Sequence, residues 1–72
     1  MYMNDFIGKY VQVYPGDTLS KFGTVEEVNS AGVIFKIDGA RSKEDYWKRN
    51  DGKMIFIAYS ARLTFIETDK NV

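Results

Sequence analysis

The stretch from Val11 to Ile37 reads Val-Gln-Val-Tyr-Pro-Gly-Asp-Thr-Leu-Ser-Lys-Phe-Gly-Thr-Val-Glu-Glu-Val-Asn-Ser-Ala-Gly-Val-Ile-Phe-Lys-Ile. It contains three runs of β-type residues, separated by turn-forming clusters at 15–17 and 29–32. The apolar residues that one face of a curled sheet can bury together are Val11, Val13, Val25, Val28, Val33, Phe35 and Ile37. We therefore predict that these three runs form the core of an all-β domain.

Two of the three runs alternate regularly. Lys9–Tyr14 and Val33–Ile37 place every second residue on one face, which is the pattern of half-buried strands. The run Phe22–Val28 does not alternate, because Val25 and Val28 stand three residues apart. A bulge at the two glutamates between them would return both valines to one face, as the bends of small barrels require. The sequence therefore predicts a bent second strand.

The first strand is bounded on both sides. Phe6 and Ile7 are expected to plug one end of the barrel. Pro15-Gly16-Asp17 ends the strand, because Pro has no amide hydrogen for the ladder and Gly tolerates a positive φ. Asn29–Gly32 is expected to be the turn between the second and third strands.

The segment from Asp38 to Lys53 is the one long polar stretch. Its 16 residues are many for a loop in a compact domain, and loops of this length are usually functional or disordered. Ser42 is expected to cap a short helical turn through Asp45. We predict that this segment is a long polar loop between strands three and four.

The last third of the chain supplies two more strands. Met54–Tyr59 is apolar on both faces, which predicts a central strand covered on both sides. A turn at Ser60–Arg62, interpreted as a single 3₁₀ turn, leads into the last strand, Leu63–Glu67. We expect the hairpin over 54–67 to seal the curled front half into a five-stranded barrel.

Five short strands, a long first connection and a turn before the last strand resemble the Src-homology-3-like (SH3-like) small barrel. Val13-x-x-Gly16 followed by Gly23-x-Val25-x-x-Val28 looks like the KOW motif of ribosomal large-subunit proteins and transcription elongation factors, with Ser20 at the motif's usual middle glycine. The segment 58–63 is similar to the 3₁₀ turn before the last strand of Src-homology-3 domains. The likeness to KOW proteins implies contact with RNA or a ribosomal protein.

Composition narrows the classes of function. The chain is long enough for a single domain, 1–72, and it contains neither Cys nor His. Thiol nucleophiles, disulfides, the commonest general base and the commonest zinc ligand are therefore absent. The adjacent pair Glu26–Glu27 would point to opposite faces of a strand, and Glu44–Asp45 is expected to be solvated. We predict a protein that is not an enzyme and that uses no cofactor or metal.

Charge and hydropathy indicate where in the cell the protein is expected. Ten basic and ten acidic side chains balance to a net charge of zero, which weighs against non-specific coating of DNA. No apolar run approaches the roughly 20 residues of a membrane helix, and the N-terminal residues lack the features of a signal peptide. We expect a soluble cytoplasmic protein without membrane contact. The chain also has the character of the small, cysteine-free accessory proteins of tailed phages.

A basic aromatic segment lies on a mildly acidic chain. Residues 1–40 contain three Lys against five Asp or Glu, a net −2, whereas 41–53 contain five Lys or Arg against three Asp or Glu, a net +2. Tyr10 and Tyr14 are expected to be exposed together on the outer face, or else to cover a neighbouring strand or pack under the 38–53 loop. Trp47 is expected either to anchor a partner or to fold back as a lid on the barrel. The candidate partner-binding residues are Tyr10, Tyr14, Arg41, Tyr46, Trp47, Lys48 and Arg49.

Three functions follow from these observations. The first is a small non-enzymatic binding module that engages a protein partner, such as a phage-type accessory or host-interaction protein. The second is a KOW-type module that binds RNA or the ribosome through phosphate contact and base stacking. The third is an oligomeric structural subunit joined through edge strands, with Ile34 and either Met54 or Ile55 at the seam. We favour the first.

Overall fold

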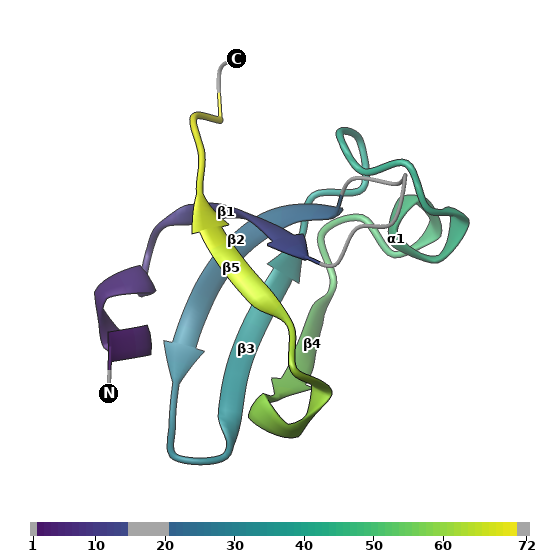
Figure 1. Ribbon diagram of the computed structural model, residues 1–72. Helices are drawn as coiled ribbons and strands as arrows, with labels where there is room; N and C mark the ends of the chain where they lie inside the picture. Colours follow the sequence, from purple (N-terminus) through teal and green to yellow (C-terminus); the bar gives the residue numbers. More distant parts are fainter. Residues whose placement is uncertain (1, 15–20, 71–72) are drawn as a thin grey trace.

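The computed structural model describes residues 2–14 and 21–70, and these residues form one curved antiparallel sheet (Figure 1). The elements in chain order are η1 (Tyr2–Phe6), β1 (Tyr10–Tyr14), β2 (Lys21–Val28), β3 (Gly32–Ile37), α1 (Asp45–Arg49), β4 (Met54–Ala58), η2 (Tyr59–Ala61) and β5 (Thr64–Glu67). The strand order is β4-β3-β2-β1-β5, so the two strands that come last in the sequence form the two edges. The prediction of an all-β fold is confirmed. The predicted turn at 15–17 lies outside the described residues.

The inner face of the sheet holds the core. Val11, Val13, Val25, Val33 and Phe35 are fully buried there. Ile37 is almost fully buried, and Val28 is half-buried and packs against the same cluster. Burial of each such side chain stabilises the fold by about 1.5–3 kcal/mol relative to exposure. The inward set predicted from the apolar pattern is therefore confirmed.

The bend in β2 is a β-bulge. Val25 is paired with Phe35, but the next pair joins Glu27 to Ile34, so Glu26 is an extra residue without a partner on β3. The extra residue brings Val25 and Val28 to the same face and curls the strand. The predicted bulge is confirmed.

Turn chemistry sets the register on both sides of β3. Asn29 Oδ1 accepts the Gly32 N–H at 3.0 Å and closes the predicted turn between β2 and β3. At the other end, Gly52 has a φ of 79° and donates its N–H to Ile37 O at 2.8 Å. The Ile37 N–H in turn donates to Lys53 O at 2.9 Å. This two-against-one arrangement is a bulge with a left-handed glycine, and it fixes which residues of β4 face β3.

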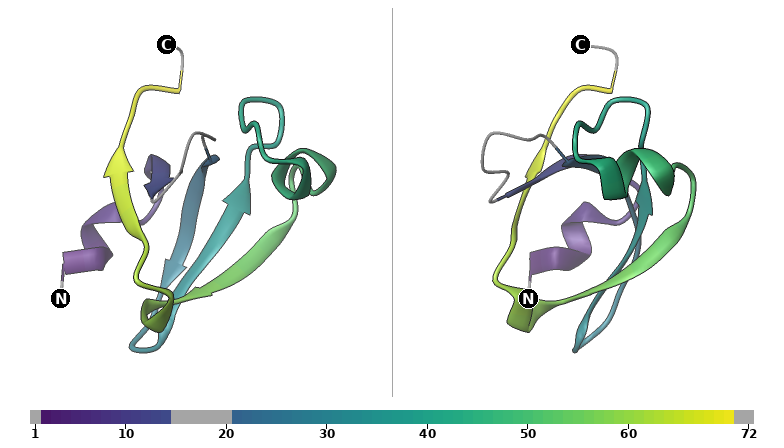
Figure 2. Two further views of the ribbon diagram at one scale, coloured as in Figure 1. Left: turned by 45° about the vertical axis from the view of Figure 1, so that its right-hand side comes forward. Right: turned by 90° about the vertical axis from the view of Figure 1, so that its right-hand side faces the viewer.

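The predicted closure of the sheet is wrong. We expected the segment 54–67 to form a hairpin, but β4 pairs with β3 and β5 pairs with β1, and no described residue pair joins β4 to β5. Figure 2 shows β4 and β5 as separate margins of the curved sheet. The reason is η2, the predicted 3₁₀ turn, where Arg62 adopts a left-handed φ of 58° and the chain crosses from one margin to the other.

Two smaller expectations also need correction. Met54–Tyr59 was predicted to be a central strand covered on both faces, but β4 is an edge strand with Met54 and Phe56 exposed. Near the N-terminus, Phe6 packs against the core as expected, whereas Ile7 is exposed. Apolar residues on both faces of a strand therefore did not mean that both faces are covered.

Candidate protein-binding surface

The long segment between β3 and β4 is fastened to the start of β2 by Ser42. Ser42 is buried, and its Oγ accepts the Phe22 N–H at 2.9 Å and donates to Asp38 O at 2.7 Å. The Asp38 N–H donates to Phe22 O at 2.9 Å, which extends the β2–β3 ladder by one residue. The prediction that Ser42 caps a helix is wrong, because its hydroxyl bonds the backbone of Phe22 and Asp38 and α1 begins only at Asp45.

The segment is also closed on itself. Asp51 Oδ1 accepts the Gly39 N–H at 2.7 Å, which joins the two ends of the segment. Gly39 leaves room for the chain above it, since a Cβ at this position would stand 2.5 Å from Trp47 O. Lys21 Nζ lies 3.4 Å from Glu44 Oε2 and links the start of β2 to the residue before α1. The segment is therefore a folded element on the sheet.

Trp47 holds α1 against the core. Its side chain is 6% exposed, and its ring meets the ring of Phe35 edge-on at a centroid distance of 5.6 Å. The structure therefore places Trp47 inside, as the lid alternative describes, and does not place its ring on the surface. The burial of one aromatic ring positions the rest of the helix.

The other side chains of α1 point outward. Tyr46 is half exposed, Lys48 and Arg49 are exposed, and the Tyr46 ring meets the edge of Trp47 at 6.3 Å. Asn50 Nδ2 donates to Tyr46 O at 2.6 Å and ends the helix. The two cations lie in the last turn, where they complement the partial negative charge of the carbonyl groups. We call Tyr46, Lys48 and Arg49 the α1 surface.

Tyr10 and Arg41 come together in a separate stack. The rings of Tyr10 and Phe22 are stacked at 6.2 Å with an interplanar angle of 18°. The Arg41 guanidinium carbon lies 4.2 Å from the Phe22 centroid and 5.6 Å from the Tyr10 centroid. Arg41 Nη1 also donates to Asp69 O at 2.8 Å. Tyr10 and Arg41 are thus half-buried and engaged with each other, and Tyr10 covers a neighbouring strand.

Tyr14 lies at the other end of β1, where it is exposed and paired with Thr64 of β5. The structure thus places the seven predicted site residues in four settings. Tyr46, Lys48 and Arg49 form the α1 surface; Tyr10 and Arg41 form the stack; Tyr14 is exposed alone; Trp47 is in the core.

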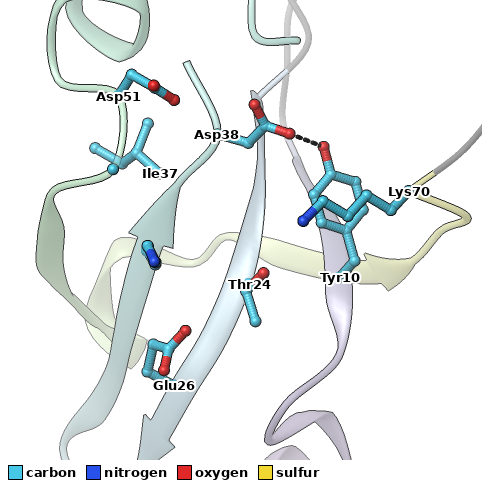
Figure 3. Close-up of a pocket in the computed structure, with 9 residues that line it drawn as sticks. Tyr10, Thr24, Glu26, Ile37, Asp38, Asp51 and Lys70 are labelled. Carbon is cyan, nitrogen blue, oxygen red and sulfur yellow. Dashed lines mark hydrogen bonds between the residues drawn. The ribbon is translucent and has the colours of Figure 1, made fainter. Parts of the chain in front are cut away.

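A polar hollow of about 420 Å³ lies on the outer face beside the stack (Figure 3). In Figure 3, Tyr10 and Asp38 point toward one another, and the Tyr10 hydroxyl donates to Asp38 Oδ2. Burial of the ring, together with this bond, raises the pKa of Tyr10 to about 12 from 10.0. The lining includes three carboxylates and two ammonium groups, from Glu26, Asp38, Asp51, Lys36 and Lys70. This mixture does not select one class of ligand.

Residues 2–14 and 21–70 contain no group of three or more acidic side chains placed to hold a metal ion. Within the same residues, no helix has the length and apolar character needed to cross a membrane.

Sequence reasoning missed two sets of residues. Phe22 and Asp38 organise the stack, but no local pattern marks them, because the residues they contact in the stack are 12 or more positions away in the chain. The second set is Phe56, which is exposed on β4 beside Met54, the residue already predicted as a seam candidate. The signal for Phe56 was present in the sequence, since a strand that is apolar on both faces is either central or an uncovered edge.

Comparisons of the chain with protein-family models, with curated proteins and with solved structures gave no match. The geometry of the described residues is therefore the ground for proposing a function.

Proposed function

We propose that this chain is a small, non-enzymatic binding module with an SH3-like architecture, and that it engages an acidic surface of another protein through the α1 surface. The architecture is supported by the strand order. Strands β2, β3 and β4 form a meander, and β5 returns to pair with β1. It is also supported by η2, which precedes the last strand as the 3₁₀ turn does in Src-homology-3 domains.

The observation that carries this proposal is the pinned helix. Because Trp47 is held in the core, the backbone of α1 is ordered before any partner arrives. A pre-ordered surface loses less conformational entropy on binding than a flexible loop. The surface presents Tyr46 and Arg49, and Tyr and Arg are enriched among residues that dominate binding energies.

The charge of the surface favours an acidic partner. Lys48 and Arg49 are both exposed, and within the described residues neither takes part in an ion pair. The segment 41–53 has five Lys or Arg against three Asp or Glu, a net +2, while the whole chain is neutral. Complementary charge steers association and fixes orientation.

A KOW-type RNA function is the second candidate, and the burial of Trp47 weighs against it. Bases stack on exposed ring faces, and each stacked base contributes about 1–3 kcal/mol to binding. Trp47 is in the core, and Tyr10 is stacked on Phe22 and lies beside Arg41. Of the aromatic candidates, Tyr46 and Tyr14 are exposed. Two rings on separate elements are a poor platform for successive bases.

The test compares two charge-matched variants of the immobilised chain. Lys48→Gln/Arg49→Gln removes the cations of the α1 surface. Lys9→Gln/Arg62→Gln removes two exposed cations that follow η1 and η2 in the chain, and the ribbon in Figure 1 shows both of these elements away from α1. We expect a protein from a lysate of the source cells to bind the wild type and the Lys9/Arg62 variant, and to be lost by the Lys48/Arg49 variant. Equal capture by all three chains would contradict the proposal, as would retention of labelled single-stranded RNA without any protein.

A further inference from the structure

The free edge of β4 exposes main-chain hydrogen-bonding groups. The bond from the Ile37 N–H to Lys53 O and the bond from the Tyr59 N–H to Ala31 O bracket the β3–β4 ladder. Pairs in an antiparallel ladder alternate, so Ile55 and Ile57 are the residues that exchange bonds with β3. The N–H and C=O groups of Met54 and Phe56, and the N–H of Ala58, therefore point away from β3. The Ala58 C=O is used by η2, for which Ala58 is the N-cap.

This edge lacks the features that normally prevent strand pairing. The strand Met-Ile-Phe-Ile-Ala contains no charge and no proline. Its outward side chains, Met54 and Phe56, are 59% and 50% exposed. Figure 2 shows no described element beside β4 on the side away from β3. The edge is thus open to a further strand.

We propose that β4 pairs with β4 of a second copy of this chain, antiparallel, about a two-fold axis through Phe56. Phe56 is the middle residue of the five-residue strand, so this axis pairs the whole strand with itself. Phe56 exchanges two main-chain bonds with Phe56 of the second copy, because each offers a free N–H and a free C=O. The Ala58 N–H of each copy donates to Met54 O of the other. This arrangement uses all of the free groups except the Met54 N–H, which lies opposite the occupied Ala58 C=O of the second copy.

The side chains on the outer face suit the same axis. Ile34 is the register partner of Phe56, so the two residues lie next to each other across the strands. The two-fold axis continues this row through Phe56 and Ile34 of the second copy. A row of four apolar side chains then runs across the seam and removes the exposed Phe56 rings from water.

The charges at the ends of β4 distinguish a second copy in antiparallel orientation from one in parallel orientation. At the Met54 end lie Lys53 and Lys36, the latter the register partner of Met54. At the Ala58 end lie Gly32, its register partner, and Tyr59, and both are uncharged. The two-fold axis sets the cationic end of one copy against the neutral end of the other, whereas parallel pairing would oppose Lys36 to Lys36. A net charge of zero also removes long-range repulsion between the copies.

Sedimentation equilibrium over a range of protein concentrations tests this proposal. We expect the wild type to shift from 8.3 kDa toward twice that mass as the concentration rises. Phe56→Lys is expected to remain at the monomer mass. Ile66→Lys is the matched control, since Ile66 is 49% exposed on the outer face of the other edge strand, and this variant is expected to dimerise like the wild type. Far-ultraviolet circular dichroism checks that each variant is folded.

Three results would overturn the proposal: a wild type that stays monomeric, a Phe56→Lys variant that still dimerises, or masses that keep growing beyond the dimer. Hydrogen exchange of the wild type gives a reading that needs no variant. The amides of Phe56 and Ala58 are expected to become protected as concentration rises, whereas those of Phe65 and Glu67 on β5 are not. Concentration-independent exchange at Phe56 would refute the pairing. Neither readout depends on the α1 surface.

Discussion

Phe35 and Phe56 lie on neighbouring strands of the same ladder and have opposite environments. Phe35 is paired with Ile55 and is fully buried; Phe56 is paired with Ile34 and is half exposed. The difference follows from direction, since paired residues share a face and successive residues alternate between faces. The inner face therefore carries the stability of the fold, and the outer face leaves large apolar side chains exposed. Four pairs of residues test this division.

The largest difference is expected between Phe35 and Phe56 themselves. Phe35→Ala should lower the free energy of unfolding by about 3–5 kcal/mol, because it leaves a cavity at the centre of the core. Phe56→Ala should change it by less than about 0.5 kcal/mol when measured at low protein concentration. Denaturant titrations followed by circular dichroism provide both values, and Phe35→Leu serves if Phe35→Ala does not fold. Similar costs at the two positions would refute the division of faces.

Trp47 and Tyr46 form the next pair. Trp47→Ala should destabilise the chain by about 3 kcal/mol, since the ring packs on Phe35 inside the core. Tyr46→Ala should leave the free energy of unfolding within about 0.5 kcal/mol of the wild type. It should, however, weaken capture of the protein partner. A Tyr46→Ala variant that is as unstable as Trp47→Ala would mean that α1 is not an exposed surface.

Ser42 and Ser60 differ in burial and in the hydrogen bonds that their hydroxyl groups make. Ser42→Ala leaves the buried Phe22 N–H without its acceptor, and we expect a cost of about 1–3 kcal/mol. Ser60 is exposed in η2, and Ser60→Ala should cost less than about 0.5 kcal/mol. Thermal or denaturant unfolding distinguishes the two. Equal, small effects would show that the 38–53 segment does not depend on the Ser42 bonds.

The smallest effect concerns pH and appears only in alkaline solution. The pKa of Tyr10 is about 12 in the folded chain and is expected to be near its ordinary 10.0 when the chain unfolds. The unfolded chain therefore releases this proton first, so the stabilisation is complete below pH 10 and is lost as the pH rises from 10 to 12. Unfolding measured across this range should show the loss in the wild type and in Tyr14→Phe, and a smaller loss in Tyr10→Phe. An unchanged pH dependence in Tyr10→Phe would show that folding does not raise the pKa of Tyr10.

Much of the fold was predictable because its signals are local. The alternation in β1 and β3, the three-residue spacing of Val25 and Val28, and the turn residues around Asn29 each act within a few positions. These signals identified the strands, the inward residues, the bulge and the 3₁₀ turn. They were reliable because a strand's faces follow from backbone geometry alone.

The candidate site was predicted only in part. The basic aromatic segment was recognised from its composition, and Tyr46, Lys48 and Arg49 do share one surface. Composition did not show that Trp47 turns inward, because that depends on its contact with the ring of Phe35, which lies 12 residues earlier in the chain. Likewise, Tyr10 contacts Phe22 of β2 and Asp38 and Arg41 of the 38–53 segment, and both of these regions are distant from it in the chain.

From the order of its residues alone, this chain specified an all-β fold, its buried valines and a charged middle segment, since periodicity and turn chemistry act over short distances. Only the tertiary structure determined that β4 is an edge strand, that β4 and β5 do not pair, and that Trp47 points into the core. Those choices depend on which distant segments pack together. Many long-range contacts decide how segments pack, so a local pattern can leave two alternatives, as it did for β4, without deciding between them.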